Sequence, residues 1–429
     1  MNRRKPSPRP KILIVGLMPA WTSIARLPRA LQEAGFEVGL ACFENSFLAA
    51  THFRDHFFPL PAGCRREILL RQIEIVVGKW QPELILPGDE DAVAFLVELW
   101  RKTPSKNGLA GLLKRSLGNP MALIEAMSKR LTLEQAARSG IRIPVHRRIL
   151  SRNDISDFAG RVGFPFVLKR SSGWGGTKVI VCRTDAEMDR ISEKWFAEIG
   201  WKQHLRVRRK DIIERLFRSR RPLEDRTVIA NEFISGRRAM CQAIAFQGRM
   251  CAALTAVKET TFPTDLSPSS ALRFVRNEEM RAAAQKLIRA WKLTGIIGFD
   301  FVINQRGAYL IECNPRPISI AHLGGLVGED LCRALYCALT SQPMPPMKQE
   351  KELTVAHFPH EQSRDPGSPH LREGLHDVPA DDPELFGMLS RLGDRQRADQ
   401  TQQNDSFLDF QTRKIESDSL NLQIINRKS

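Results

Sequence analysis

Short apolar segments alternate with amphipathic segments through the first 117 residues of the chain. The apolar segments are typical of strands and the amphipathic ones of helices. In chain order they are Lys11 to Gly16, Ser23 to Ala34, Phe36 to Cys42, Arg66 to Trp80, Glu83 to Pro87 and Asp89 to Trp100. Strands that alternate with helices predict a parallel sheet. The turn after the first strand lacks the Gly-x-Gly-x-x-Gly pattern, so a Rossmann dinucleotide site is not predicted.

Two acidic residues follow the third of these strands. Asp89 and Glu90 stand where the strand ends and the next helix begins. Open parallel sheets bind ligands at the carboxyl ends of their strands, which favours a ligand site here. Acids in the first turn of a helix are also stabilised by the helix dipole. The sequence leaves both interpretations open.

Near residue 300, acidic and amide side chains stand within apolar runs. The runs from Gly295 to Ile303 and from Tyr309 to Cys313 predict two strands of a hairpin. Side chains two positions apart on a strand share a face, so Glu312 and Asn314 are expected to project together.

The hairpin loop decides which residue lies opposite Glu312. If the loop is Gln305-Arg306-Gly307 with Gly307 in the left-handed conformation, Asn304 pairs with Ala308 and Asp300 lies opposite Glu312. Two carboxylates and an amide oxygen then converge. Such a set suits Mg²⁺, with Mn²⁺ as an alternative, completed by water and nucleotide phosphates. The other interpretation is a structural ion pair of Arg316 with Glu312.

A glycine-rich hairpin earlier in the chain carries groups that bind phosphate. The strand from Phe164 to Lys169 ends in a lysine and is followed by a loop and a second strand, Lys178 to Cys182. Glycines let backbone amides surround anionic oxygens, and Lys169 adds a positive charge. The loop residues expected at the phosphates are Ser172, Gly173, Gly175 and Gly176. This is not a Walker loop, and a plain β-turn is the alternative for this segment considered alone.

Together these motifs resemble the ATP-grasp superfamily over about residues 11 to 340. D-alanine ligases, biotin carboxylases and the synthetase units of carbamoyl-phosphate synthase are members. The resemblance implies an α/β N-terminal domain with a parallel sheet, followed by an α+β ATP-grasp domain of two lobes. It also implies ATP and Mg²⁺ as the bound nucleotide and metal.

The resemblance assigns roles to single residues. Lys129 and Lys169 match the two lysines that contact ATP, and the glycine-rich loop matches the lid over its phosphates. The segment Val228 to Gly236 resembles the hinge strand beside adenine, with contacts expected from Glu232, Phe233 and Ile234. Asp300, Glu312 and Asn314 match the metal ligands.

Two further residues match catalytic positions. Arg316 matches the arginine that faces the transferred phosphoryl group or the substrate carboxylate. Lys258 stands where a basic residue of the family can touch the γ-phosphate, although a surface lysine is an equal alternative.

The chain departs from the family pattern at two places. Arg237 and Arg238 follow the hinge glycine, where many members carry an acid that holds the ribose. Gly298 stands where some ligases carry an arginine that binds a substrate carboxylate. The resemblance therefore does not extend to the ribose contacts or to the substrate grip of D-alanine ligases.

The composition favours a globular cytoplasmic protein. Apolar residues make up 42% of the 429, and no apolar run approaches the roughly 20 residues needed to cross a bilayer. The basic start precedes the short apolar run Ile12 to Met18, which we interpret as a strand rather than as part of a signal peptide. The eight cysteines show no Cys-x-x-Cys spacing, which indicates reduced, buried thiols.

The net charge of +17 is densest between Arg206 and Arg226. Such a segment can bind nucleic acid or anionic lipid, but interleaved aromatic residues and a known nucleic-acid module are missing from it. We interpret the predicted helix from Arg206 to Arg221 as solvated or as a neighbour of an anionic substrate.

We expect six segments along the chain. They are a basic tail at 1–10, the N-terminal α/β domain at 11–120, an ATP-grasp lobe with the phosphate hairpin at 121–226, an ATP-grasp lobe with the hinge and metal site at 227–340, a C-terminal extension at 341–394 and a disordered tail at 395–429. The tail is rich in polar residues and has too few apolar ones to stabilise a fold.

The leading hypothesis is an ATP- and Mg²⁺-dependent ligase that activates a carboxylate as an acyl phosphate for attack by an amine, or secondarily a thiol. Such chemistry asks a protein mainly for positioning and charge neutralisation. Its partners are small-molecule carboxylate and amine substrates, and a homodimer is left open. The alternatives are a non-catalytic ATP-binding regulatory protein and, with less support, a basic nucleic-acid-binding protein.

Overall fold

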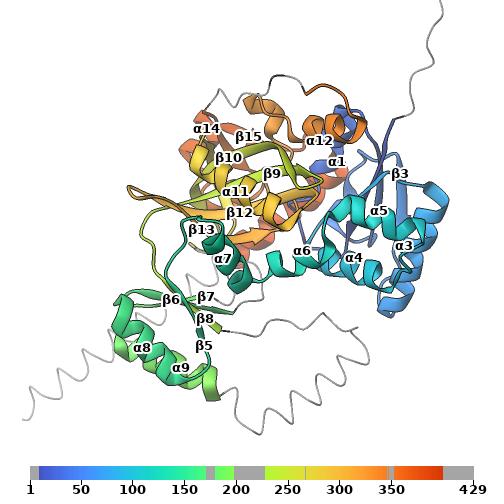
Figure 1. Cartoon of the computed structure of the whole chain (residues 1–429). Helices are drawn as coiled ribbons and strands as arrows, with labels where there is room; N and C mark the ends of the chain where they lie inside the picture. The colour runs from blue at the N-terminus through green and yellow to red at the C-terminus, as the bar shows by residue number, and fades with distance from the viewer. Residues whose placement is uncertain are drawn as a thin grey trace, which may run out of the picture. The chain divides into compact units, whose positions relative to one another are not determined.

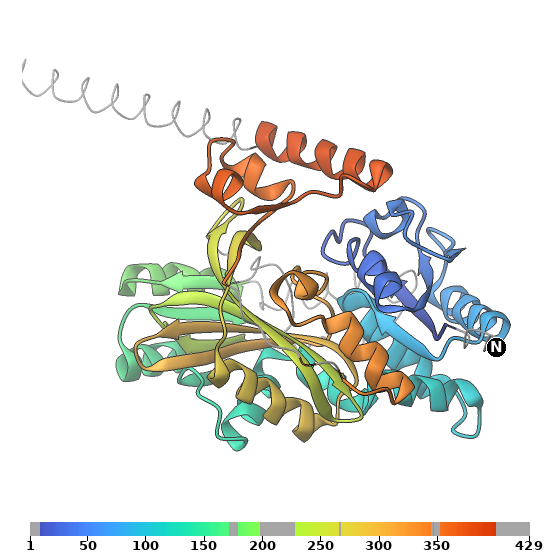
Figure 2. The same cartoon turned by 90° about the horizontal axis from the view of Figure 1, so that it is seen from above.

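The computed structural model describes residues 9–170, 179–197, 228–265, 267–344, 346 and 352–399. The chain divides into two units, which the two views of the whole chain show from different sides (Figures 1 and 2). Unit 1 contains residues 1–258 and 272–353, and unit 2 contains residues 259–271 and 354–429.

The predicted parallel sheet opens unit 1. Its strand order is β3-β2-β1-β4, with all pairings parallel. The strands are β1 (Lys11–Gly16), β2 (Glu37–Cys42), β3 (His56–Pro59) and β4 (Leu84–Pro87), and the helices between and after them are α1 (Leu27–Ala34), α2 (Phe47–Ala50), α3 (Arg66–Trp80) and α4 (Glu90–Lys102). The short elements α2 and β3 were not predicted. In β3 two residues are exposed and two are partly buried, and the strand has no alternating pattern.

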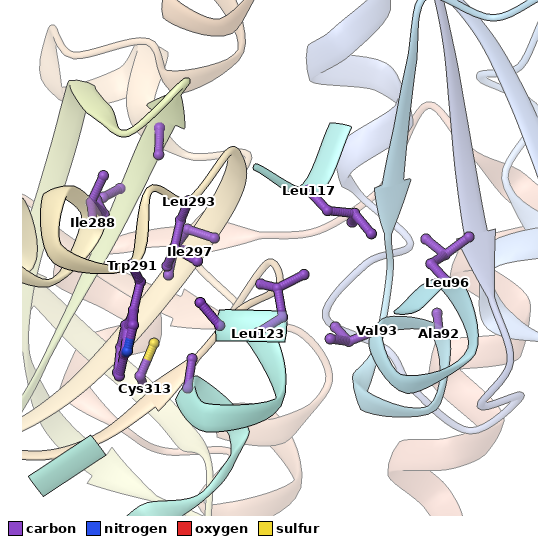
Figure 3. Packing of buried hydrophobic residues seen from close by; sticks show 14 of the residues in the cluster. Ala92, Val93, Leu96, Leu117, Leu123, Ile288, Trp291, Leu293, Ile297 and Cys313 are labelled. Atoms are coloured by element: carbon purple, nitrogen blue, oxygen red, sulfur yellow. The ribbon is translucent and has the colours of Figure 1, made fainter. Parts of the chain in front are cut away.

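Three helices connect this sheet to the next part of unit 1: α5 (Gly108–Leu117), α6 (Pro120–Met127) and α7 (Lys129–Arg138). Leu117 and Leu123 lie between side chains of α4 and side chains of the later strands, including Ile297 and Cys313 (Figure 3). A single apolar core therefore joins the N-terminal sheet to the strands that carry the predicted metal ligands.

A smaller lobe contains the predicted phosphate-binding strand. Its four-stranded sheet has the order β5-β8-β6-β7. The elements are β5 (His146–Ile149), α8 (Arg152–Val162), β6 (Phe166–Arg170), β7 (Val179–Cys182), α9 (Asp185–Ala197) and β8 (Val228–Glu232). Phe166, Leu168 and Ala230 bury one face of the sheet with Phe158 of α8, so Lys169 lies on the opposite face.

The largest sheet carries the acidic residues. Five of its strands lie in the order β13-β12-β9-β10-β11. They are β9 (Arg237–Phe246), β10 (Arg249–Thr261), β11 (Ser269–Phe274), β12 (Gly295–Asn304) and β13 (Gly307–Asn314). Helix α11 (Glu278–Trp291) packs on this sheet (Figures 1 and 2), and the chain continues through a 3-10 helix, Gly324–Val327, and α12 (Leu331–Thr340). The turn between β9 and β10 lies at Gln247 and Gly248, which both have positive φ.

Unit 2 is built around two short parallel strands, β14 (Thr354–His357) and β15 (Leu375–Asp377). It also contains α13 (His360–Arg364), α14 (Pro369–Glu373) and a helix over residues 383–399. Residues 395–399 were predicted to begin a disordered tail, but they continue the helix; residues beyond 399 lie outside the described part.

Two whole-chain expectations can be compared with these elements. Each of the eight cysteines is a free thiol, and six of them are buried. Among the helices of the described residues, none combines the length and apolar content needed to cross a membrane.

A buried carboxylate, Glu361, links three segments of unit 2. Its oxygens accept hydrogen bonds from Arg364 Nε at 3.0 Å, Arg364 Nη2 at 2.6 Å, Ser368 Oγ at 2.5 Å and Thr260 Oγ1 at 2.8 Å. Burial by itself would raise the pKa of Glu361, but these bonds outweigh burial and lower the pKa from 4.5 to about 2. Glu361 thus ties α13 to the 259–271 segment of the same unit.

We predict that Glu361→Gln destabilises unit 2 by about 2 kcal/mol, because buried donors lose a charged acceptor. Differential scanning calorimetry of the full chain should show a lower transition temperature, whereas Glu384→Gln, at an exposed position, should leave it unchanged. Because the folded pKa is depressed, the Glu361 contribution is present above pH 4.5 and is lost as the pH falls towards about 2. Equal melting of both variants at pH 7 would contradict this role.

Candidate active site

The hairpin of β12 and β13 brings Asp300 opposite Glu312, as predicted, but by a different route. Asn304 pairs with Gly307 instead of Ala308, so the loop is the two residues Gln305 and Arg306. The register then shifts between Asp300 and Phe301, because β13 contains one extra residue, Ile311. The predicted three-residue loop was therefore wrong, and a β-bulge supplies the shift that the loop was expected to supply.

The bulge decides which face Glu312 and Asn314 occupy. Ala308 and Leu310 are buried in the core of unit 1, and so is Cys313. Without an extra residue, strict alternation would place Glu312 on the same face as Leu310. The bulge reverses the alternation, so Glu312 and Asn314 share the opposite face with Asp300.

The three predicted metal ligands form one cluster on that face. Asn314 Nδ2 donates to Asp300 Oδ2 at 2.9 Å, and Asp300 pairs directly with Glu312 across the hairpin. Lys129 Nζ lies 3.3 Å from Glu312 Oε2, and Lys258 Nζ lies 3.9 Å from Asp300 Oδ1. The structure therefore brings five of the predicted site residues together.

Two carboxylates at one place perturb each other. Burial raises the pKa of Asp300 to about 6, against the attraction of Lys258, and Glu312 raises it further. Burial also disfavours the charged form of Glu312, but Lys129 and Lys169 outweigh it and lower the pKa of Glu312 to about 2. Glu312 therefore carries negative charge beside the Asp300 oxygens, and the two side chains together attract cations.

Lys169 is a buried cation, with 4% of its surface exposed. Burial lowers its pKa to about 8, Glu312 opposes that change, and Lys129 adds to it. With the Asn231 amide in the orientation that satisfies both of its groups, Asn231 Oδ1 accepts from Lys169 Nζ at 3.1 Å. Asn231 thus fixes the lysine on the face of the lobe's sheet opposite Phe166 and Leu168.

Arg316 is buried and pairs with an unexpected partner. Its Nη2 donates to Glu90 Oε1 in a short contact, its Nη1 donates to Pro317 O at 3.0 Å, and its guanidinium lies 4.3 Å from the ring centre of Trp21. The alternative ion pair of Arg316 with Glu312 is therefore wrong. The guanidinium stays close to the cluster, since Nη2 lies 3.5 Å from Asn314 Oδ1.

The acids after β4 have separate roles. Asp89 Oδ1 accepts from Ala92 N at 2.8 Å as the N-cap of α4, and Asp89 Oδ2 accepts from Leu17 N at 2.7 Å and Met18 N at 2.9 Å. Asp89 therefore holds the two loops at the carboxyl edge of the sheet, while Glu90 reaches Arg316.

The predicted adenine contacts lie at the end of β8. Glu232 Oε2 accepts from Val145 N at 3.1 Å, so its carboxylate holds β5. Phe233 is 41% exposed and follows the strand, with the partly buried Ile234 next to it. Four loop residues predicted at the phosphates lie outside the described part of the chain: Ser172, Gly173, Gly175 and Gly176. The predicted basic helix, Arg206 to Arg221, also lies outside it.

Sequence reasoning missed Trp21, Asn231, Gln242 and the pairing of Glu90. Gln242 lies on β9 opposite Gly298, and its Oε1 accepts from Ile318 N at 2.6 Å. A polar residue inside the apolar run of β9 was the available signal for Gln242. The partners of Arg316 come from distant parts of the chain, and no local pattern indicates them.

The departure at Gly298 has a structural reason. A Cβ atom at this position would lie 2.6 Å from Ile318 Cγ2, which is closer than side chains approach. An arginine here would displace Ile318, and with it the Gln242 contact.

The cluster fits a divalent cation with few protein ligands. Within the described residues there is no group of three or more His, Cys, Asp and Glu side chains that could hold a metal ion. A metal at Asp300 and Glu312 would therefore take the Asn314 amide, water and phosphate oxygens as its remaining ligands, as Mg²⁺ commonly does.

Comparison with known proteins gives a consistent result. Residues 126–319 match the ATP-grasp domain family. Over 377 residues, or 82% of this chain, the sequence is 23% identical to the carbamoyl phosphate synthase large chain of Thermus thermophilus, in each of two strains. The match spans 33% of the length of those relatives.

Solved structures share the fold. The biotin carboxylase domain of Hydrogenobacter thermophilus 2-oxoglutarate carboxylase, solved as a dimer with MgADP, ADP and bicarbonate, has a TM-score of 0.57 at 15% identity, covering 80% of this chain and 73% of that one. The L-amino acid ligase from Bacillus licheniformis has a TM-score of 0.53 at 13% identity, covering 81% of this chain and 80% of that one. This chain therefore contains an ATP-grasp domain, within a fold that it shares with biotin carboxylase and L-amino acid ligase.

Proposed function

We propose that the protein is an ATP- and Mg²⁺-dependent ligase that activates a carboxylate as an acyl phosphate for attack by an amine. The observation that carries this proposal is the cluster on the β12–β13 hairpin. There Asp300 and Glu312 lie side by side, with Lys129 and Lys258 within 4.0 Å of them. The shared fold supports nucleotide binding, since one relative was solved with MgADP. A cytoplasmic location is part of the same proposal.

Mg²⁺, when bound, neutralises charge on the nucleotide phosphates. Asp300, Glu312 and Asn314 would hold it, because they offer hard oxygen ligands on one face. The protein's own side chains supply the remaining charge neutralisation and the positioning of the reactants. Lys169 and Lys129 provide positive charge beside Glu312, and in this proposal they contact phosphate oxygens. Their charges act strongly because Lys169 is buried.

The first reaction step joins the substrate carboxylate to the γ-phosphate. A carboxylate oxygen attacks the γ-phosphorus, the bond from that phosphorus to the β-phosphate oxygen breaks, and ADP leaves with the electron pair. Arg316 orients the carboxylate through charge-assisted hydrogen bonds. Lys258, whose Nζ lies 3.9 Å from Asp300 Oδ1, would balance charge on the transferred group.

The second step forms the new bond. The amine attacks the acyl carbon, phosphate leaves, and the amine proton passes to phosphate or solvent. Positioning of the two reactants is the main requirement for both steps. A thiol acceptor would follow the same sequence and give a thioester.

The two alternatives have less support. A regulatory ATP-binding protein has no need for Lys258 and Arg316 beside the acidic cluster, where the structure has both. Nucleic-acid binding depends on the segment from Arg206 to Arg221, which lies outside the described residues.

We predict that Lys169→Met weakens MgATP binding at least about tenfold, because a charge-assisted contact is worth about 1.5 to 3 kcal/mol. Methionine keeps most of the buried volume, so the fold should persist. Isothermal titration with MgATP measures the effect. Lys286→Met, which removes an exposed lysine that donates to Gly140 O at 3.3 Å, serves as the control. Equal affinity of both variants would remove Lys169 from the nucleotide site.

We also predict that Asp300→Asn and Glu312→Gln each reduce phosphoryl transfer on the order of 100-fold while the protein stays folded. Each change removes one negative charge from the metal ligands and nearly preserves shape. ADP release against Mg²⁺ concentration, together with thermal melting, measures both effects. Glu278→Gln, at an exposed acid, is the control. Lower melting temperatures with an unchanged Mg²⁺ dependence would instead assign the two acids a structural role.

A further inference from the structure

A buried ion pair joins two distant parts of unit 1. Arg316 follows β13, and Glu90 is the first residue of α4. Their side chains are only 6% and 14% exposed. The Trp21 ring covers one face of the guanidinium. Both charges are therefore largely removed from water, and each depends on the other for compensation.

Within the described residues, three polar atoms of this pair and of a neighbouring glutamine have no hydrogen-bond partner: Glu90 Oε2, Arg316 Nε and Gln242 Nε2. Gln242 belongs to the same place, because its Oε1 accepts from the backbone of Ile318, two residues after Arg316. The set consists of one anionic acceptor and two donors. An ammonium group matches the acceptor, and a carboxylate matches the donors.

The location relates this set to the proposed reaction. Arg316 Nη2 lies 3.5 Å from Asn314 Oδ1, so a carboxylate held by Arg316 would lie beside the acidic cluster. Glu90 stands beyond the carboxyl end of β4, at the edge where open parallel sheets bind ligands. The ammonium group would thus lie between the activated carboxylate and the carboxyl end of β4 in the N-terminal sheet.

A ligand must separate the pair to reach these atoms, since all three are covered. A ligand with a single charge would compensate one member of the pair and leave the other buried without a partner, which is strongly unfavourable. A zwitterion compensates both members at once. The buried pair therefore selects against simple carboxylates and simple amines.

We propose that the carboxylate substrate is a free α-amino acid, with its carboxylate held by Arg316 and Gln242 and its ammonium group held by Glu90. This inference rests on the proposed ligase function. The amino acid carboxylate takes the γ-phosphoryl group from ATP, and ADP leaves with the electron pair of the broken bond. The product is an aminoacyl phosphate, and no oxidant or reductant is required.

Hydroxylamine tests this directly, because it displaces phosphate from an acyl phosphate and forms a hydroxamate, which gives a coloured complex when Fe(III) is added. The full-length protein is incubated with MgATP, hydroxylamine and each common α-amino acid in its L and D forms. The deaminated acid of the same side chain is assayed beside each one. We expect at least one amino acid to be activated with kcat/KM at least about tenfold above that of its deaminated acid.

Glu90→Gln should reduce kcat/KM for that amino acid at least about tenfold and leave the deaminated acid unaffected or improved. The affinity for MgATP should not change. Glu98→Gln is the matched control, since Glu98 lies on the same helix and pairs with Arg66 at 2.6 Å with similar burial. The ratio of kcat/KM for the amino acid to kcat/KM for the deaminated acid should change in Glu90→Gln and not in Glu98→Gln. Loss of folding would lower both values and leave their ratio unchanged, so a changed ratio identifies substrate recognition.

The outcomes separate this inference from the function on which it rests. If the wild-type protein activates deaminated acids with the same kcat/KM as the amino acids, the amino acid site is overturned and the ligase function stays in place. If neither class yields hydroxamate and no amino acid raises the melting temperature in the presence of MgADP, both proposals fail. The wild-type comparison decides the question even if Glu90→Gln does not fold.

Discussion

The single extra residue in β13 is the constraint on which the site depends. Strands alternate between faces, and Leu310 must lie in the core. Ile311 reverses the alternation after Leu310, so the next acidic and amide side chains leave the core face. Glu312 and Asn314 thereby lie on the same face as Asp300, while Cys313 packs in the hydrophobic core. The bulge thus lets one short strand serve both a hydrophobic core and a charged site.

Charge balance follows from that geometry. Asp300 and Glu312 are adjacent, and the cations around them come from separate elements: Lys129 from α7, Lys169 from β6 and Lys258 from β10. Arg316 is instead compensated by Glu90, which belongs to the N-terminal sheet region. The site is therefore assembled from the N-terminal sheet region, the smaller lobe and the large sheet. A metal nucleotide and a zwitterionic substrate would both add charges that this arrangement can compensate.

Local sequence patterns predicted the features that depend on neighbouring residues, namely individual strands, helices and turns. The strands β1 and β4, the helix α3 and the turn at Gln247 and Gly248 follow from periodicity and turn residues. The pairing of Asp300 with Glu312 was predicted from a wrong loop, because a two-residue turn and a bulge give the same register as a three-residue turn. The partner of Arg316 was not predictable, because Glu90 lies 226 residues away in sequence and packing alone brings them together.

The most direct test of the account is the fate of a carboxylate oxygen. If ATP phosphorylates a carboxylate at this site, a substrate labelled with ¹⁸O in its carboxyl group must transfer one labelled oxygen to the phosphate released in each turnover. Phosphorus NMR of the phosphate formed from MgATP, hydroxylamine and labelled amino acids measures this transfer. The account predicts singly labelled phosphate. Release of unlabelled phosphate at the same rate would show that water, not a carboxylate, receives the phosphoryl group, and would contradict it.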